Sequence, residues 1–176
     1  MTPDNGFRRQ PWRRIAAFGV DYIVILVFIG AQIAWRASQG GLEMPPPDMS
    51  TDARLALQFN GFLWTTLPVF LYFTLCESVW GRTLGKRIAG LRVDGTPGRI
   101  ALRNALKFLP WEIAHTGLWH GWTVPLFGEP GPIALVLMSV ANVLIAIYLA
   151  SLFIGAGRTP YDRLSRTSVR PHLTKR

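Results

Sequence analysis

Apolar residues are grouped in long, nearly uncharged blocks along this chain. Three blocks cover residues 15–35, 55–80 and 133–154, and each contains at most one charged residue. An α-helix rises ~1.5 Å per residue, so a helix of this length crosses the ~30 Å hydrocarbon core of a bilayer. One such block could be a buried helix of a soluble core, but three leave too little polar chain to enclose them. The pattern therefore predicts an all-α, polytopic membrane protein.

The charged residues indicate how the chain lies in the membrane. Of 176 residues, 19 are Lys or Arg and 10 are Asp or Glu, and 17 of the 19 cationic residues fall within 1–14, 81–107 and 156–176. Residues 36–54 are slightly acidic instead. Cytoplasmic loops of membrane proteins carry the excess of Lys and Arg. We therefore expect a multi-pass protein of a bacterial-type inner (plasma) membrane, with both termini and the central loop in the cytoplasm.

This topology requires a second span between the central loop and the tail. The segment Ala105–Phe127 is largely apolar, and we expect it to be that span. A re-entrant or interfacial segment at 108–127 is the alternative, because Pro110 and Pro125 can break a helix whose backbone is covered by protein. The expected organisation is a cytoplasmic N-terminus at 1–14, four transmembrane helices at about 15–36, 55–79, 105–127 and 133–155, an amphipathic basic loop at 80–104 and a cytoplasmic tail at 156–176.

Two carboxylates lie within the apolar blocks. A charged side chain in mid-bilayer costs ~2.5–3.5 kcal/mol or more. Each of these carboxylates is therefore expected to have an ionic or hydrogen-bonding partner or a functional role. Asp21 argues against a cleaved signal peptide, and it lies on the same helical face as Arg14. It is expected either to form a structural ion pair with an Arg of the central loop or tail, or to titrate with a proton or cation. Glu77 is expected to be an interfacial carboxylate that reaches the cytoplasmic surface.

The third apolar segment carries a second group of polar side chains. Glu112 and His115 are three residues apart and share a helical face, and His120 lies nearby. A Glu-x-x-His pair is half of the carboxylate-bridged metal sites found in helical bundles, and a second copy of the chain would have to supply the other half. Metal binding, a proton relay and plain hydrogen bonding inside the bundle all remain open. No other cofactor is expected.

The central loop is both basic and amphipathic. Apolar residues alternate with four cationic ones, which are Arg82, Lys86, Arg87 and Arg92. Such a segment can lie on anionic lipids, with each cation contributing ~1 kcal/mol near the surface. The glycines at 81, 85 and 90 indicate turns or close packing instead of one long helix.

Other function classes find no support. The single cysteine, Cys76, excludes an internal disulfide framework and a Cys-rich zinc site. Phosphate-binding glycine loops and a nucleophile elbow are absent from the sequence. We therefore expect no enzymatic activity and no nucleic-acid partner.

Three polar motifs are similar to those of a known family. Residues 13–21 (RRIAAFGVD) resemble the opening motif of the RDD family of membrane proteins, 81–93 (GRTLGKRIAGLRV) its central signature, and 157–169 (GRTPYDRLSRTSV) its closing motif. The family is named for one Arg and two Asp. The resemblance carries these over to Arg14, Asp21 and Asp162, with Arg13 as the alternative for the arginine.

The RDD resemblance implies a function in the membrane. It favours a cation/proton-coupled transporter or permeation element, in which Asp21 titrates and Arg14 competes internally for it. Asp162 would then organise the cytoplasmic loop through Arg82, Lys86 or Arg87. Four spans give little room for a pathway, so we expect an oligomer. A non-catalytic assembly or scaffold component of a membrane complex is the alternative.

Overall fold

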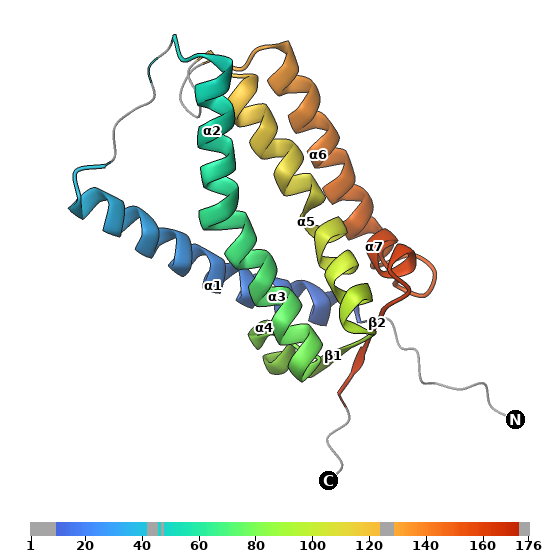
Figure 1. Cartoon of the computed structure of the whole chain (residues 1–176). Helices are drawn as coiled ribbons and strands as arrows, with labels where there is room; N and C mark the ends of the chain where they lie inside the picture. The colour runs from blue at the N-terminus through green and yellow to red at the C-terminus, as the bar shows by residue number, and fades with distance from the viewer. Residues whose placement is uncertain (1–9, 42–45, 47, 124–128, 173–176) are drawn as a thin grey trace, which may run out of the picture. The chain divides into compact units, whose positions relative to one another are not determined.

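The fold of this protein is described from a computed structural model, which covers residues 10–41, 46, 48–123 and 129–172. Figure 1 shows the elements in chain order. They are α1 (Pro11–Ser38), α2 (Thr51–Gly61), η2 (Phe62–Thr66), α3 (Leu67–Trp80), α4 (Leu84–Ile88), β1 (Leu91–Asp94), α5 (Pro97–His120), α6 (Pro132–Ser151), α7 (Pro160–Leu164) and β2 (Ser168–Pro171). The chain divides into two compact units, which are described separately below. Unit 1 contains residues 1–24, 70–107 and 146–176, and unit 2 contains residues 25–69 and 108–145.

Three helical segments are long and apolar enough to cross a membrane. They are Pro11–Ser38, the continuous run Thr51–Trp80 and Pro132–Ser151. Large apolar side chains such as Val27, Leu75 and Val136 are exposed on all three. A soluble protein rarely leaves so much contiguous apolar surface in water, whereas a bilayer covers it. The prediction of a membrane protein is therefore supported, and the three apolar blocks correspond to these helices.

The fourth predicted span is not among these candidates. Helix α5 begins at Pro97, well before the predicted start at residue 105, and its described part ends at His120. Pro110 lies inside this helix without breaking it, because the carbonyl of Leu106 that it leaves unbonded accepts a hydrogen bond from the Tyr148 hydroxyl (2.9 Å). A break at Pro110, which the re-entrant alternative allowed, is therefore not observed. Pro125 lies outside the described residues.

The proline of the second apolar segment is accommodated in the same way. Pro68 follows the single π-helical turn η2, where the Leu67 amide donates to the Phe62 carbonyl. Pro68 cannot bond the carbonyl of Trp64, and that oxygen instead accepts a hydrogen bond from the side chain of Gln32. Side chains from neighbouring helices thus satisfy the backbone groups that these prolines leave free, as a low-dielectric environment requires.

Unit 1 contains a small sheet that the all-α prediction missed. Strands β1 and β2 pair antiparallel, from Leu91 opposite Pro171 to Asp94 opposite Ser168. The central loop, expected to be one amphipathic segment, consists of the short helix α4, strand β1 and the first turns of α5. The basic tail folds into α7 and β2. The sheet therefore ties the central loop to the tail within unit 1.

Candidate functional site

Unit 1 buries three carboxylates together with cationic side chains. Asp21 and Asp162 are 0% exposed and Glu77 is 1% exposed. They come from α1, α7 and α3, which are far apart in the sequence. Buried carboxylates need cationic partners or several hydrogen-bond donors. Their partners define the ionic network described next.

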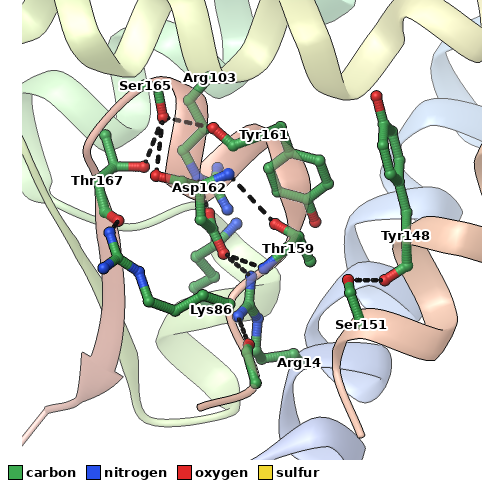
Figure 2. A network of polar contacts seen from close by, with 12 residues as sticks. Arg14, Lys86, Arg103, Tyr148, Ser151, Thr159, Tyr161, Asp162, Ser165 and Thr167 are labelled. Atoms are coloured by element: carbon green, nitrogen blue, oxygen red, sulfur yellow. Dashed lines mark hydrogen bonds and ion pairs between the residues drawn. The ribbon is translucent and has the colours of Figure 1, made fainter. Parts of the chain in front are cut away.

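Asp162 lies at the first turn of α7. Its backbone amide bonds the Thr159 hydroxyl while its own carboxylate accepts from the Thr159 amide, which forms a capping box. The carboxylate also accepts hydrogen bonds from Arg14 Nη2 (2.6 Å) and Arg103 Nε (2.9 Å). Figure 2 shows Asp162 beside Arg103 and Thr159. Burial alone would raise its pKa, but Arg103 and Arg14 outweigh burial and lower the pKa to about 2.

Glu77 forms the second half of the network. Its carboxylate accepts hydrogen bonds from Lys86 Nζ (2.7 Å), Arg103 Nη1 (2.9 Å) and Asn104 Nδ2 (3.2 Å). The expectation of an interfacial carboxylate that reaches the surface is wrong. Lys86 and Arg103 neutralise the Glu77 carboxylate inside the protein, and the side chain remains buried.

Arg103 joins the two halves. Its guanidinium binds Glu77 through Nη1 and Asp162 through Nε. Its Cζ atom lies 5.3 Å from the centre of the Tyr161 ring, and the residue is 2% exposed. Burial acts to lower its pKa, but the two carboxylates raise it above the ordinary arginine value. The planar fork of arginine suits such bridging.

Asp21 has a different environment. Within the described chain its carboxylate accepts hydrogen bonds from the Thr83 hydroxyl (2.6 Å), the Gly85 amide (2.8 Å) and the Tyr72 hydroxyl (3.1 Å). All three donors are neutral. Of the two alternatives for Asp21, an ion pair with an arginine of the loop or tail is not observed among the described contacts. Arg14 extends past this site and bonds Asp162 and the Gly157 carbonyl (2.7 Å) instead.

The four basic residues of the central loop have separate roles. Lys86 enters the network, whereas Arg87 and Arg92 are exposed and Arg82 is half-buried. The expectation that Asp162 organises this loop through Arg82, Lys86 or Arg87 is wrong, because its cationic partners are Arg14 and Arg103. These partners reach Asp162 from α1 and α5.

In unit 2 the predicted group on α5 is dispersed. Glu112 accepts a hydrogen bond from the Thr66 hydroxyl (2.6 Å), and His120 bonds the side chain of Gln58 (2.7 Å). The His115 ring lies edge-on to Trp111, with 4.4 Å between ring centres. No group of three or more metal-ligating side chains occurs in the part of the chain that the structure describes. Single-chain ligation by Glu112, His115 and His120 is thus not observed, and the arrangement matches interhelical hydrogen bonding.

The family comparison agrees with the polar motifs of unit 1. A family model described as RDD family matches residues 8–166. The chain belongs to the RDD family. No curated protein and no solved structure matches it.

The two arginines that the resemblance offers for the RDD name have different partners. Arg14 bonds the second aspartate of the set, Asp162, whereas Arg13 is exposed and donates to the Ala89 carbonyl (2.9 Å). Of the three residues that the resemblance assigns in this RDD protein, Arg14 and Asp162 are therefore partners, and Asp21 is held separately by neutral donors.

The contacts of two residues of this RDD protein were not predicted from the sequence. Arg103 was counted only as a basic residue of the central loop, although Arg103 and Lys107 are spaced by one helical turn beside Asn104. A polar stripe on a helix that continues into an apolar segment was the available signal. The other residue is Arg54 in unit 2, which donates to the carbonyls of Trp119 and Trp122 (3.0 and 2.9 Å) and so caps the end of α5.

Proposed function

We propose that this RDD protein is a non-enzymatic transporter or permeation element, and that Asp21 binds the cation or proton whose movement it couples. The observation that carries the proposal is the environment of Asp21. This carboxylate is fully buried in α1, one of the apolar helices, and it is held by neutral donors rather than by Arg14. A buried carboxylate of this kind gains most from binding a proton or a cation.

The neighbouring hydroxyls are suited to such exchange. The hydroxyls of Thr83 and Tyr72 donate to Asp21, but a hydroxyl can also turn and present its lone pairs. When a cation occupies the site, these two oxygens and the carboxylate can act as hard oxygen ligands. When a proton occupies it, the protonated carboxyl can donate to one of them.

Substitution of Asp21 by Asn tests the proposal. In proteoliposomes with an imposed Na⁺ or K⁺ gradient, the native protein is expected to move protons, followed with an enclosed pH-sensitive dye. Asp21→Asn should abolish this coupled movement, because the amide has nearly the same shape and no charge to bind a cation.

The matched control is Glu129→Gln, an exposed carboxylate far from the network in sequence, which should transport like the native protein. Thermal unfolding in detergent identifies variants that fail to fold. A folded Asp21→Asn variant with native flux would exclude Asp21 as the coupling residue. Native protein without flux would remove the transport proposal itself.

We also propose four spans, with both terminal segments and the central loop in the cytoplasm. The support is the distribution of cationic residues and the continuation of α5 beyond the basic loop, from residue 105 to His120. Fusions of green fluorescent protein after Arg176 should fluoresce, and alkaline phosphatase fused after Pro46 or Glu129 should be active outside. Active phosphatase after Arg176 would contradict the fourth span.

A second candidate is an assembly component whose cationic face binds anionic lipids or a partner in an oligomeric complex. The favouring observation is the surface of unit 1, where seven arginines are exposed, namely Arg13, Arg87, Arg92, Arg99, Arg163, Arg166 and Arg170. The ionic network would then serve to fix the loop and tail that present them. Flux in the proteoliposome experiment separates the two candidates, since an assembly component carries none.

A further inference from the structure

The polar segments that follow α3 and α6 are copies of one another. Six residues recur with a constant offset of 76 positions, which indicates an internal repeat. The pairs are Tyr72/Tyr148, Gly81/Gly157, Arg82/Arg158, Thr83/Thr159, Arg87/Arg163 and Val93/Val169. Residues 81–93 are the first motif copy and residues 157–169 the second, and their positions can be compared one by one.

Both motif copies fold in the same way. Thr83 caps α4 and Thr159 caps α7, and each of these helices has 5 residues. Seven residues after each threonine the backbone turns left-handed, at Gly90 (φ 62°) and at Arg166 (φ 54°), and a strand follows. A non-glycine residue with positive φ is uncommon, so its presence at Arg166 indicates that the second copy keeps the backbone of the first.

The two strands hold both motif copies on the same side of the membrane. Val93 of β1 pairs with Val169 of β2, which is its own counterpart in the other copy. In an antiparallel ladder, this register places an approximate two-fold axis between the strands. Each copy also follows an apolar helix, α3 or α6. We therefore expect the two copies at the same depth, as in the parallel repeats of other membrane proteins.

Each short helix presents the same two side chains to its surroundings. Arg87 and Arg163 are exposed, and the residues after them, Ile88 and Leu164, are 67% and 68% exposed. The third residue of each helix is instead buried in the ionic network. The network therefore holds each helix by one face and leaves an arginine and a large apolar side chain on the outside.

A second arginine lies at the end of each short helix. Arg13 Nε donates to the carbonyl of Ala89 (2.9 Å), which is the C-cap residue of α4. In the second copy the Arg166 amide donates to the Arg163 carbonyl (3.2 Å), just after α7. Arg13 and Arg166 are both exposed. Each copy thus combines two cationic side chains with one exposed apolar side chain.

An anionic phospholipid matches this combination of side chains. Guanidinium groups bind phosphate with two hydrogen bonds, and cationic residues at a membrane surface attract anionic lipids. An exposed apolar side chain beside them can enter the boundary between headgroups and acyl chains. The first copy is close to this boundary, because three residues separate α4 from Trp80, the exposed last residue of α3.

The two-fold arrangement favours lipids over a protein partner. Lipids surround a membrane protein on every side, so both motif copies meet them in the same way. A single protein that recognised both copies would itself need two equivalent surfaces related by a two-fold axis. The repetition of Arg87-Ile88 as Arg163-Leu164 is therefore explained more simply by contact with the bilayer.

We propose that the two motif copies are a pair of equivalent binding sites for anionic phospholipids of the cytoplasmic leaflet. Each lipid site holds the phosphate with two arginines and places one apolar side chain against the acyl chains. The residues are Arg13, Arg87 and Ile88 in the first lipid site, and Arg163, Arg166 and Leu164 in the second. The lipid sites rest on the second candidate function, whose cationic face they resolve into two positions, and they do not depend on transport at Asp21.

Native mass spectrometry of the purified protein in detergent measures lipid binding without requiring transport. Titration with phosphatidylglycerol should show two tight binding steps, whereas the zwitterionic phosphatidylcholine should bind weakly. Arg87→Gln should weaken one of these steps about fivefold and Arg163→Gln the other, since each arginine near the surface contributes to the attraction. The double variant Arg87→Gln/Arg163→Gln should weaken both. The control is Arg36→Gln, an exposed site in the last turn of α1, which should bind lipid like the native protein.

Two further measurements identify the part of the lipid that is bound. Soluble glycerol 3-phosphate carries an anionic phosphate without acyl chains, and it should bind far more weakly than phosphatidylglycerol. Ile88→Ser/Leu164→Ser should weaken the binding of phosphatidylglycerol severalfold, because the apolar contacts are lost. All the substituted side chains are exposed, so the unfolding midpoint without lipid should stay close to the native value and verifies that each variant folds.

The outcomes separate the lipid sites from both candidate functions. Unchanged binding in the folded double variant, equal binding of phosphatidylcholine, or equally tight binding of glycerol 3-phosphate would overturn the lipid sites. Arg92→Gln/Arg99→Gln removes two exposed arginines of unit 1 that lie outside them. An equal loss in that variant would mean that lipids bind the overall charge of unit 1, which overturns the two sites and keeps the second candidate function. Native protein that retains no phosphatidylglycerol would refute the lipid sites together with lipid binding by the second candidate, and proton flux would remain the separate test of transport.

Discussion

Arg103→Met is expected to lower the free energy of unfolding by about 3–5 kcal/mol, because it leaves Glu77 and Asp162 with one cationic partner fewer while both stay buried. Net stabilities of about 5–15 kcal/mol leave little room for such a loss. The measurement is thermal unfolding of purified protein in detergent, followed by tryptophan fluorescence. We expect a lower midpoint and a lower yield of folded protein.

Arg99→Met is the matched control for Arg103→Met. Arg99 lies one turn earlier on α5 and is exposed, so its loss should change the unfolding free energy by less than about 0.5 kcal/mol. Arg103→Lys keeps the charge but lacks the fork that reaches two carboxylates, and should fall between the two. Equal stability of Arg103→Met and Arg99→Met would mean that the contacts of Arg103 in the ionic network contribute nothing to the free energy of unfolding.

Acid unfolding gives a second measure of the same variant. In the native protein the pKa of Asp162 is lowered to about 2, below its ordinary value of 3.8. The carboxylate therefore stabilises the fold fully above that ordinary value, and this stabilisation is lost as the pH falls through about 2. In Arg103→Met only Arg14 remains as a cationic partner, so the pKa should rise. The stabilisation contributed by this carboxylate should then be smaller, and its loss on acidification should end at a higher pH than in the native protein.

The helices could be predicted because their signal is local. A run of about 20 apolar residues indicates a membrane helix without reference to the rest of the chain. Residues 15–36, 55–79 and 133–155 were recognised for this reason, and they correspond to Pro11–Ser38, Thr51–Trp80 and Pro132–Ser151. The three polar motifs likewise lie within single short segments, so the RDD family could be recognised from them and is confirmed.

The partners of the charged residues could not be predicted, because they depend on contacts far apart in sequence. Arg14 and Asp21 share a helical face, which favoured Arg14 as the internal competitor for Asp21. Arg14 instead reaches Asp162, which is 148 residues away. Strands β1 and β2 were missed for the same reason, since four-residue strands such as Leu91–Asp94 form only beside a partner from the tail.

Gly85→Ala is expected to disrupt the Asp21 site and to destabilise the fold by about 2–6 kcal/mol. A Cβ at residue 85 would lie 1.9 Å from the carbonyl oxygen of Ala17 and 2.9 Å from Asp21 Cγ, so α4 would have to move away from α1. Overpacking of this kind costs about 1–3 kcal/mol. The movement also removes the Gly85 amide and the Thr83 hydroxyl from a buried carboxylate, at a further cost of about 1–3 kcal/mol. Thermal unfolding in detergent measures the sum.

Gly19→Ala is the control for Gly85→Ala, because it makes the same chemical change on α1, where an added Cβ has no neighbour within 4 Å. Replacing a mid-helix glycine by alanine should stabilise the helix by about 0.5–1 kcal/mol. A double variant with Asp21→Asn then shows whether Gly85 acts through the carboxylate. If it does, the losses from Gly85→Ala and Asp21→Asn will be less than additive, since both remove the same hydrogen bonds. Strict additivity would mean that the close approach of α4 to α1 serves packing alone and that Asp21 does not depend on it.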